Sequence, residues 1–307
     1  MIRYNPRPIL LGLFFSNQRN CELSMFSDDT TRLNRILGSK HRMELPLVCV
    51  VLTGCTVDEM LKDASLATAA GADLVEVRLD KLWTREMELE ESEEGNDAKK
   101  SHKGEVEYEV QPLDSVDLKS ALSSFKQGIE LPVILTCRPE RQGGYYPGDE
   151  SSRIEVLRTA IESGVSWVDL EVDISASDRK SLMEKASGKT KIIASYHSEE
   201  NPPPSSEIVA EVEDYSSHGD MVKICFPVQG SEGALRIFEA AWEMRNSDIK
   251  MSLMGVGPGG DWVRIHAPLL GQNMVYSTMQ VGWHLTHSGK INVSDLTTAW
   301  NLLGYSS

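Results

Sequence analysis

The stretch 47–80 reads LVCVVLTGCTVDEMLKDASLATAAGADLVEVRLD and holds a complete strand–helix–strand unit. Leu47–Leu52 is an apolar run typical of a buried strand. Val57–Ala64 has helical spacing of apolar residues, and Gly71 stands where that helix is expected to end. A second strand is expected at Asp73–Asp80. Two strands joined by a helix predict a parallel sheet that is covered by helices.

The same alternation continues along the chain. Further strands are expected at Leu131–Arg138, Ser166–Asp173, Lys191–His197, Asp220–Phe226, Lys250–Met254 and Asn273–Thr278, and a final helix from about residue 293 to 303. Eight strands with helical crossovers predict an α/β fold, a single-domain (β/α)8 TIM barrel. An open doubly wound sheet is the alternative, but no Gly-x-Gly-x-x-Gly turn follows the first strand.

Composition narrows the function classes. The 307 residues are 40% hydrophobic, which is enough for one sizeable core. The net charge of −15 argues against nucleic acid or an anionic membrane as a partner, because phosphate binding needs a basic surface. The five cysteines are odd in number and lack metal-ligand spacing, which suits a reducing compartment.

The ends of the predicted domain are set by changes in composition. Residues 1–44 are read as a leader, disordered or targeting, because Arg3 and Arg7 precede a short apolar run and no acidic residue appears before Glu22. The run is too short to span a membrane. The barrel is placed at 45–307, with an acidic insertion at about 84–112 that is expected to be a solvated or disordered loop.

Two of the predicted strands alternate apolar and charged residues, although a buried parallel strand is normally apolar on both faces. Charges on the inner face of a barrel need partners there. The charged faces carry Glu76, Arg78 and Asp80 in one strand and Asp169, Glu171 and Asp173 in another.

Basic groups are expected at the same end of the barrel. Arg138 ends one strand, His197 ends another, and Lys223 lies within a third. Because the carboxyl ends of barrel strands meet at one mouth, these residues predict a catalytic site. The alternative is a structural ion-pair network, which explains Glu76 with Arg78 but not the other three.

Lys223 and His197 suggest the chemistry. A lysine inside an apolar strand is costly to ionise, so its amine tends toward the neutral, nucleophilic form. A histidine on the neighbouring strand supplies a base, and the pair therefore indicates imine chemistry. The alternative is a lysine that reaches solvent and a histidine that is satisfied in the core.

These motifs resemble type I 3-dehydroquinate dehydratase, the imine-forming enzyme of the shikimate pathway, and in particular the dehydratase half of plant enzymes that also carry shikimate dehydrogenase. The resemblance runs from about residue 45 to 303, and its order and strand placement make it specific. The matching stretches are Gly71–Asp80, Thr136–Pro139, Gly143–Gly144, Ser195–His197 and Val222–Ile224.

The resemblance implies a lyase that converts 3-dehydroquinate to 3-dehydroshikimate in aromatic amino acid biosynthesis. Lys223 would form the imine, and His197 would move the proton. The residues implied to bind substrate or to shape the site are Glu76, Arg78, Arg138 and Arg264, the last through the substrate carboxylate. No metal or organic cofactor is implied, and His266, His284 and His287 are read as loop histidines.

Three features depart from the family pattern: Gln142, the altered lid and the acidic insertion. The first two keep another reading open. Gln142 stands where the family usually has a glutamate that orients the histidine, and Leu285–Lys290 differs from the family's Ser-Ala-Pro-Gly-Gln lid. The loop Gly255–Gly260 is unusually glycine-rich and is expected to be a mobile connection. The alternatives are a weakened relative that binds a shikimate-pathway ligand or regulates a partner, and a class I aldolase.

The remaining expectations concern binding partners, cellular location and substrate capture. The partner is a small anionic substrate, with neither nucleic acid nor membrane, and a homodimer is left open. A plastid or cytoplasmic location is expected. The acidic insertion emerges at the mouth, so it is predicted to slow the capture of an anionic substrate at low salt.

Overall fold

The computed structural model describes residues 45–87, 107–280 and 284–305. The predicted leader and the run of glutamates from Glu88 to Glu94 lie outside the described residues. The predicted lid Leu285–Lys290 lies within them, apart from the side chain of Thr286. All that follows concerns the compact unit Met43–Ser307. None of the described helices is long and apolar enough to cross a membrane.

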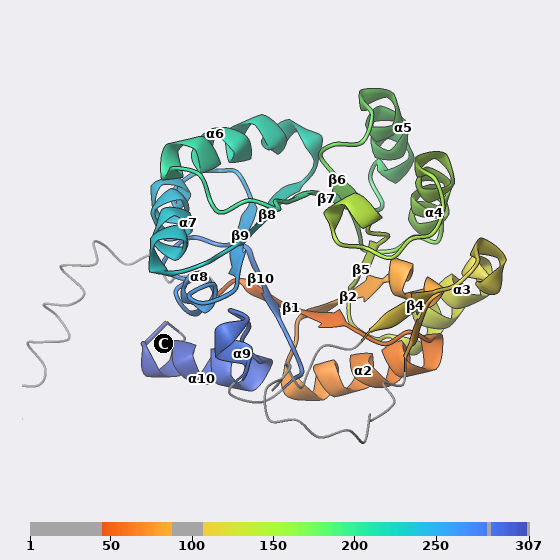
Figure 1. Cartoon of the computed structure of the whole chain (residues 1–307), viewed down its shortest axis with the longest axis horizontal. Coiled ribbons are helices and arrows are strands. Elements are labelled where there is room, and N and C mark those ends of the chain that lie inside the picture. The colour runs from red at the N-terminus through yellow and green to blue at the C-terminus, as the bar shows by residue number, and fades with distance from the viewer. Residues whose placement is uncertain (1–44, 88–106, 281–283, 306–307) are drawn as a thin grey trace, which may run out of the picture. The chain divides into compact units, whose positions relative to one another are not determined.

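Eight parallel strands form the central sheet (Figure 1). They are β1 (Leu47–Leu52), β2 (Leu74–Arg78), β5 (Val133–Thr136), β6 (Trp167–Glu171), β7 (Lys191–His197), β8 (Met221–Pro227), β9 (Met251–Val256) and β10 (Met274–Ser277). Their order is β10-β1-β2-β5-β6-β7-β8-β9. Asn273 joins the two ends of this order, since its N–H donates to Met251 O at 3.0 Å and its Oδ1 accepts from Met251 N at 2.9 Å. The predicted TIM barrel is confirmed.

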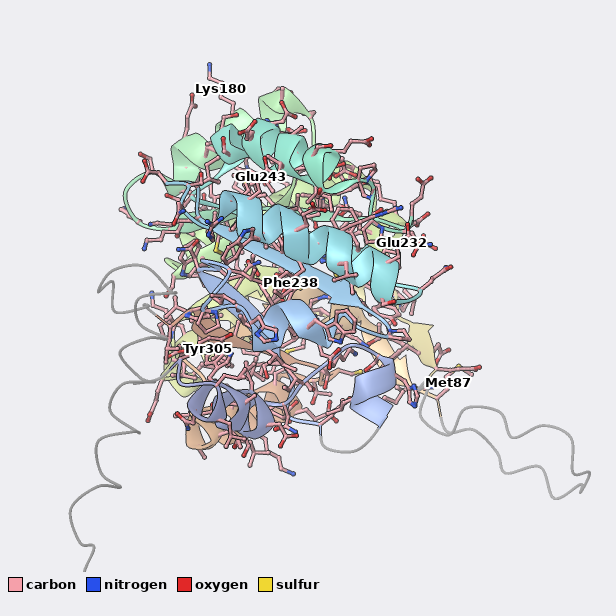
Figure 2. The ribbon with its side chains drawn as sticks, turned by 90° about the vertical axis from the view of Figure 1, so that its left-hand side faces the viewer. Met87, Lys180, Glu232, Phe238, Glu243 and Tyr305 are labelled. Atoms are coloured by element: carbon pink, nitrogen blue, oxygen red, sulfur yellow. The ribbon has the colours of Figure 1, made fainter. Side chains whose placement is uncertain are left out.

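Helices surround the strands on the outside (Figure 1). They are α2 (Val57–Ala70), α3 (Leu118–Gly128), α4 (Glu150–Glu162), α5 (Ala176–Ala186), α6 (Ser205–Tyr215), α7 (Ser231–Met244), α8 (Asp261–Ile265), α9 (His284–His287) and α10 (Val293–Leu302). Short 3-10 turns are η1 (Leu79–Trp83), η2 (Leu113–Ser115), η3 (Glu140–Gln142) and η4 (Ser216–His218). Figure 2 shows α7 on the outer surface, with the exposed Glu232 and Glu243 near its ends.

The first strand–helix–strand unit shows why the local sequence folds this way. Thr56 accepts a hydrogen bond from Glu59 N at 3.2 Å, and the Glu59 carboxylate accepts from Thr56 N at 3.1 Å. This capping box starts α2 and stabilises it by about 1 kcal/mol. Gly71 ends the helix with φ 90°, a left-handed conformation that favours glycine, and the chain then enters β2.

Alternation along the strands separates two environments. Val75 and Val77 are fully buried in the apolar layer beneath the helices, while Glu76 between them lies inside the barrel beside Lys223. The barrel interior also has an apolar cluster, which includes Leu74, Ile134, Ile193, Met221 and Met274 near the starts of their strands. Polar side chains are therefore gathered toward the carboxyl ends of the strands, where barrel enzymes hold their chemistry.

The acidic insertion is not loop throughout. Its two ends form the antiparallel strands β3 (Thr84–Glu86) and β4 (Tyr108–Val110). The Lys81 amine lies 3.1 Å from the ring centroid of Tyr108 and 4.5 Å from that of Tyr145, so cation–π contacts tie this ladder to the loop after β5. The predicted effect of the insertion on substrate capture rests on residues outside the described ranges and stays a prediction.

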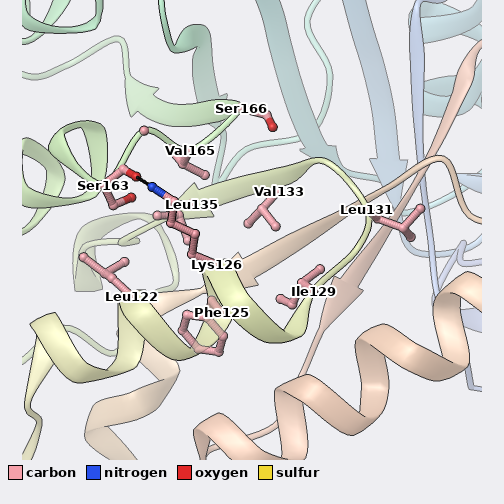
Figure 3. Close-up of a pocket in the computed structure, with 11 residues that line it drawn as sticks. Leu122, Phe125, Lys126, Ile129, Leu131, Val133, Leu135, Ser163, Val165 and Ser166 are labelled. Atoms are coloured by element: carbon pink, nitrogen blue, oxygen red, sulfur yellow. Dashed lines mark hydrogen bonds between the residues drawn. The ribbon is translucent and has the colours of Figure 1, made fainter.

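A cavity of about 140 Å³ lies between α3 and β5 (Figure 3). Its walls include Leu122, Phe125 and Val133, and Lys126 Nζ donates to Ser163 O at 3.0 Å across one side. The lining segments precede β5 and β6, so the cavity lies at the amino ends of the strands, opposite the polar mouth of the barrel.

Candidate active site

Lys223 lies inside the barrel on β8 and is only 3% exposed. Its Nζ is 3.2 Å from Asp169 Oδ2 and 3.5 Å from Glu76 Oε1. The amine also lies 4.1 Å from the ring centroid of Tyr276. The lysine therefore does not reach toward solvent, and the alternative prediction of a solvent-reaching lysine is wrong.

Arg138 joins the carboxylates around the lysine and is 2% exposed. Its Nη2 donates to Asp169 Oδ2 at 2.9 Å, and its Nη1 donates to Glu171 Oε1 at 2.8 Å and to Ser195 Oγ at 2.9 Å. The other oxygen of Glu171 accepts from Arg153 Nη1 at 2.6 Å. Each buried charge in this group has an opposite charge within hydrogen-bond distance, as the low-dielectric interior requires.

The charges around Asp169 determine its ionisation. Burial opposes the ionisation of Asp169, but the charges of Arg138 and Lys223 outweigh it and hold the pKa of that carboxyl well below its usual range. Asp169 is therefore an anion at neutral pH. The guanidinium of Arg138 is paired with both Asp169 and Glu171.

His197 ends β7, and its Nδ1 atom is buried with no hydrogen-bond partner among the described residues. Burial, with the charges of Arg138 and Lys223, lowers the pKa of the imidazole well below 6.5, and Asp169 only partly opposes this. The ring is therefore neutral at neutral pH and is able to accept a proton. Gln142 Oε1 accepts from the main-chain N–H of His197 at 3.3 Å, so the glutamine holds the backbone rather than the ring.

Glu76 and Arg78 do not form the ion pair that belonged to the alternative of a structural network. Glu76 Oε1 accepts from Thr136 Oγ1 at 2.6 Å in addition to its contact with the lysine. Arg78 instead forms a bidentate pair with Asp80, with distances of 2.8 and 2.7 Å. Asp80 also accepts from Tyr145 N at 3.2 Å, so it fixes both the arginine and the loop after β5.

Arg264 in α8 is 5% exposed, so it is not an ordinary surface residue. Its Nη1 atom donates to the carbonyls of Gly255, Gly260 and Gly289 at 2.6, 2.7 and 2.7 Å, and its Nε donates to Tyr276 O at 3.0 Å. The loop expected to be a mobile connection is thus bound to a buried arginine. Among its side-chain nitrogens, only Nη2 has no hydrogen bond to a described residue.

Two residues near the lysine were not singled out from the sequence. Asp169 was placed on the inner face of its strand, but its contact with Lys223 was not anticipated. Tyr276 was missed altogether. The sequence feature that could have identified it is the tyrosine itself, in the strand Met274–Ser277. Alternation along this strand assigns the tyrosine to the inner face.

The other candidate ligands lie apart from this cluster. His266 Nδ1 lies 2.9 Å from Tyr305 OH and its ring packs against Phe238 of α7. The side chain of His284 is outside the described residues. Within the described ranges, no three His, Cys, Asp or Glu side chains lie close enough together to hold a metal ion.

The fold and the cluster define a class of TIM-barrel enzymes, in which a buried lysine amine and a neutral imidazole face one charged interior at the carboxyl ends of the strands. The sequence profile of the type I 3-dehydroquinase family matches residues 48–307. The chain belongs to the type I 3-dehydroquinase family, a family of lyases.

Similar proteins agree with this assignment. The chain is 27% identical over 259 residues to the 3-dehydroquinate dehydratase of Methanopyrus kandleri, with 84% of this chain and 100% of the relative covered. It is 28% identical over 300 residues to the chloroplastic bifunctional 3-dehydroquinate dehydratase/shikimate dehydrogenase of Arabidopsis thaliana, covering 96% of this chain and 44% of that protein. The type I 3-dehydroquinate dehydratase structure from Clostridium difficile shares the fold, with a TM-score of 0.68, 20% identity and coverage of 85% and 93%.

Proposed function

We propose that this chain dehydrates 3-dehydroquinate to 3-dehydroshikimate in the shikimate pathway, through an imine on Lys223. Family membership supports the reaction. The observation that carries the mechanism is the enclosure of the Lys223 amine by Asp169 and Glu76, with the neutral imidazole of His197 at the same end of the barrel.

The first step joins the Lys223 nitrogen to the substrate's ketone carbon, and the ketone oxygen leaves as water. The amine attacks after it has lost a proton, and neutral His197 is a base at the same mouth. An ammonium ion and a ketone give an iminium ion and water, so the nitrogen carries one positive charge before and after the step. Asp169 and Glu76 therefore match both charged forms, and the buried site does not have to reorganise.

The second step is elimination. The iminium withdraws electrons, so the adjacent C–H bond becomes acidic, and His197 takes that proton while the bonding pair moves to form an enamine. The enamine then expels the hydroxyl group, which leaves as water with the proton from His197. Hydrolysis of the remaining conjugated imine consumes one water and frees the product and the lysine.

The arginines have different roles in this proposal. Arg138 acts through Asp169 and Glu171 and is a positioning residue. Arg78, partly exposed at the mouth, is proposed to bind a substrate hydroxyl, and the Nη2 group of Arg264 is proposed to bind the carboxylate. A plastid or cytoplasmic location and a homodimer remain predictions.

A second candidate is a weakened relative that binds a pathway ligand without full turnover. The contact between Gln142 and the backbone of His197 favours it, since no described residue bonds to the buried Nδ1 of the ring. An imidazolium formed there has no carboxylate hydrogen-bonded to Nδ1 among the described residues, and loss of such a partner slows proton transfer in other enzymes. The class I aldolase reading has no support from the family match.

The test is intact-mass measurement after mixing the protein with 3-dehydroquinate and borohydride, followed by peptide mapping. An adduct on Lys223 that has lost the elements of water supports imine formation and dehydration together. An adduct that keeps this water supports the weakened relative, and the absence of any adduct contradicts the imine. Lys223→Met should abolish trapping, whereas Lys180→Met, on the outer surface in Figure 2, should not change it.

A further inference from the structure

Tyr276 brings a phenol into the centre of the barrel. It lies on β10, pairs in register with Cys49 of β1, and is 6% exposed. The neighbouring Val275 packs in the layer beneath the helices, so alternation turns the tyrosine inward. The face of its ring lies against the Lys223 amine, 4.1 Å from Nζ to the ring centroid.

The hydroxyl of Tyr276 is buried and has no hydrogen-bond partner among the described residues. A buried hydroxyl without a partner costs free energy, and such groups are uncommon in folded proteins. Both oxygens of Asp169 accept hydrogen bonds, from Ser195, Arg138 and Lys223, and Glu76 Oε1 accepts from Thr136 and Lys223. Neither carboxylate accepts from the Tyr276 hydroxyl. The described part of the chain thus holds a buried donor without a bonded acceptor.

We propose that Tyr276 is a substrate-positioning residue, whose hydroxyl donates a hydrogen bond to an oxygen of the cyclic hydroxy acid held on Lys223. The ring face covers the Lys223 amine, so the hydroxyl at the edge of the ring reaches the space beside the amine. The substrate atoms next to the imine carbon would lie in this space. The same face stabilises the positive nitrogen of both the ammonium and the iminium. This inference rests on the proposed function for the identity of the ligand.

Two further properties agree with a donor role. Burial, followed by the charge of Glu76, raises the pKa of Tyr276 well above 10, so the phenol keeps its proton at neutral pH. The main-chain carbonyl of Tyr276 accepts from Arg264 Nε at 3.0 Å. This bond fixes the backbone beneath the tyrosine and links its position to the loops that Arg264 holds.

The test compares Tyr276→Phe with Tyr305→Phe, a matched removal of a hydroxyl whose partner is His266 outside the barrel. The ligand is quinate, a cyclic polyhydroxy acid with an alcohol in place of the reacting ketone, so it binds without forming an imine. We expect Tyr276→Phe to bind quinate about tenfold more weakly, the effect of one hydrogen bond, and Tyr305→Phe to bind it as the wild type does.

A second measurement separates ligand binding from a structural role. Removal of an unpartnered buried hydroxyl should leave the melting temperature of the free Tyr276→Phe protein equal or higher, while the stabilisation by saturating quinate becomes smaller. A lower melting temperature with unchanged quinate affinity would overturn the inference, as would a wild type that does not bind quinate.

Turnover of 3-dehydroquinate by the wild type is measured in parallel. If the wild type turns over and both variants bind quinate equally, the inference fails and the proposed function stands. If the wild type neither turns over nor forms a trapped adduct, but Tyr276→Phe still loses tenfold in quinate affinity, the proposed function fails and Tyr276 is a binding residue of a ligand-binding relative.

Discussion

Lys223 and Arg138 share one oxygen atom of Asp169: Nζ of the lysine is 3.2 Å and Nη2 of the arginine is 2.9 Å from Oδ2. The lysine's position is therefore coupled to the arginine through a single counter-ion. Arg138 also donates hydrogen bonds to Ser195 of β7 and Glu171 of β6, so these residues help to hold the arginine in place. Residues of β6 and β7, joined by Arg138 after β5, thus fix the place of the amine.

We expect Asp169→Asn to destabilise the protein by about 3–5 kcal/mol, because it leaves two buried cations without their common counter-ion. Urea denaturation at neutral pH measures the change. The matched control is Asp149→Asn, since Asp149 is the exposed N-cap of α4 and accepts from Ser152 N at 2.8 Å. Asparagine caps a helix as well as aspartate does, so the control should stay within about 0.5 kcal/mol. Equal losses in the two variants would contradict the role of Asp169.

His197→Asn should lower kcat by about 10²–10⁴-fold, the usual contribution of a positioned general base. The lysine remains, so borohydride should still trap 3-dehydroquinate on Lys223, now as an adduct that keeps its water. Steady-state kinetics and intact mass measure the two effects. His266→Asn, which changes a histidine bonded to Tyr305 on the outside, should leave kcat unchanged. Normal turnover by His197→Asn would assign the base to another residue.

The pH dependence should follow the lowered pKa of His197. In the free enzyme the imidazole stays neutral as the pH falls through 6.5, so the acid limb of kcat/KM should lie well below 6.5. Between the folded-state pKa and 6.5 the unfolded chain binds more protons than the folded chain. The free energy of unfolding therefore falls as the pH decreases through this window. Denaturation at several pH values should show a slope that is smaller in His197→Asn, and an identical slope would rule out this linkage.

Gln142→Glu should place a carboxylate next to His197, in contact distance of its main chain. An opposite charge favours the imidazolium, so we expect the acid limb of kcat/KM to move up by about one to two pH units. The rate profile of the variant against the wild type gives this shift. Gln127→Glu, at an exposed position of α3, adds the same charge and should not move the limb. A profile unchanged in Gln142→Glu would mean that the carboxylate turns away from the ring.

Arg264→Lys should cost about 3 kcal/mol, because a lysine cannot satisfy the carbonyls of Gly255, Gly260 and Gly289 together. Chemical denaturation measures the loss. Arg158→Lys changes a partly exposed arginine paired with Glu155 at 3.2 Å, and should stay within about 0.5 kcal/mol. If Nη2 also binds the substrate carboxylate, KM should rise in Arg264→Lys. An unchanged KM would mean that Arg264 only holds the loops and does not bind the substrate carboxylate.

The sequence by itself was enough to predict the barrel. Apolar strands such as Leu47–Leu52 and capped helices such as α2 are local features. Eight such strands that alternate with helices are compatible with few fold topologies. The strict period of two in β2 and β6 also placed Glu76 and Asp169 on the inner face. Sequence periodicity therefore determined the fold and which side chains face the barrel interior.

The tertiary structure alone decided which of these groups meet. Glu76 pairs with Lys223, 147 positions away, rather than with Arg78 two positions on. Arg264 binds main-chain carbonyls, which carry no mark in the sequence, and Tyr276 is left with a buried hydroxyl and no described partner. Periodicity fixes the face of a strand, but partners depend on the relative register of all eight strands and on loop closure, and these are set only when the barrel packs.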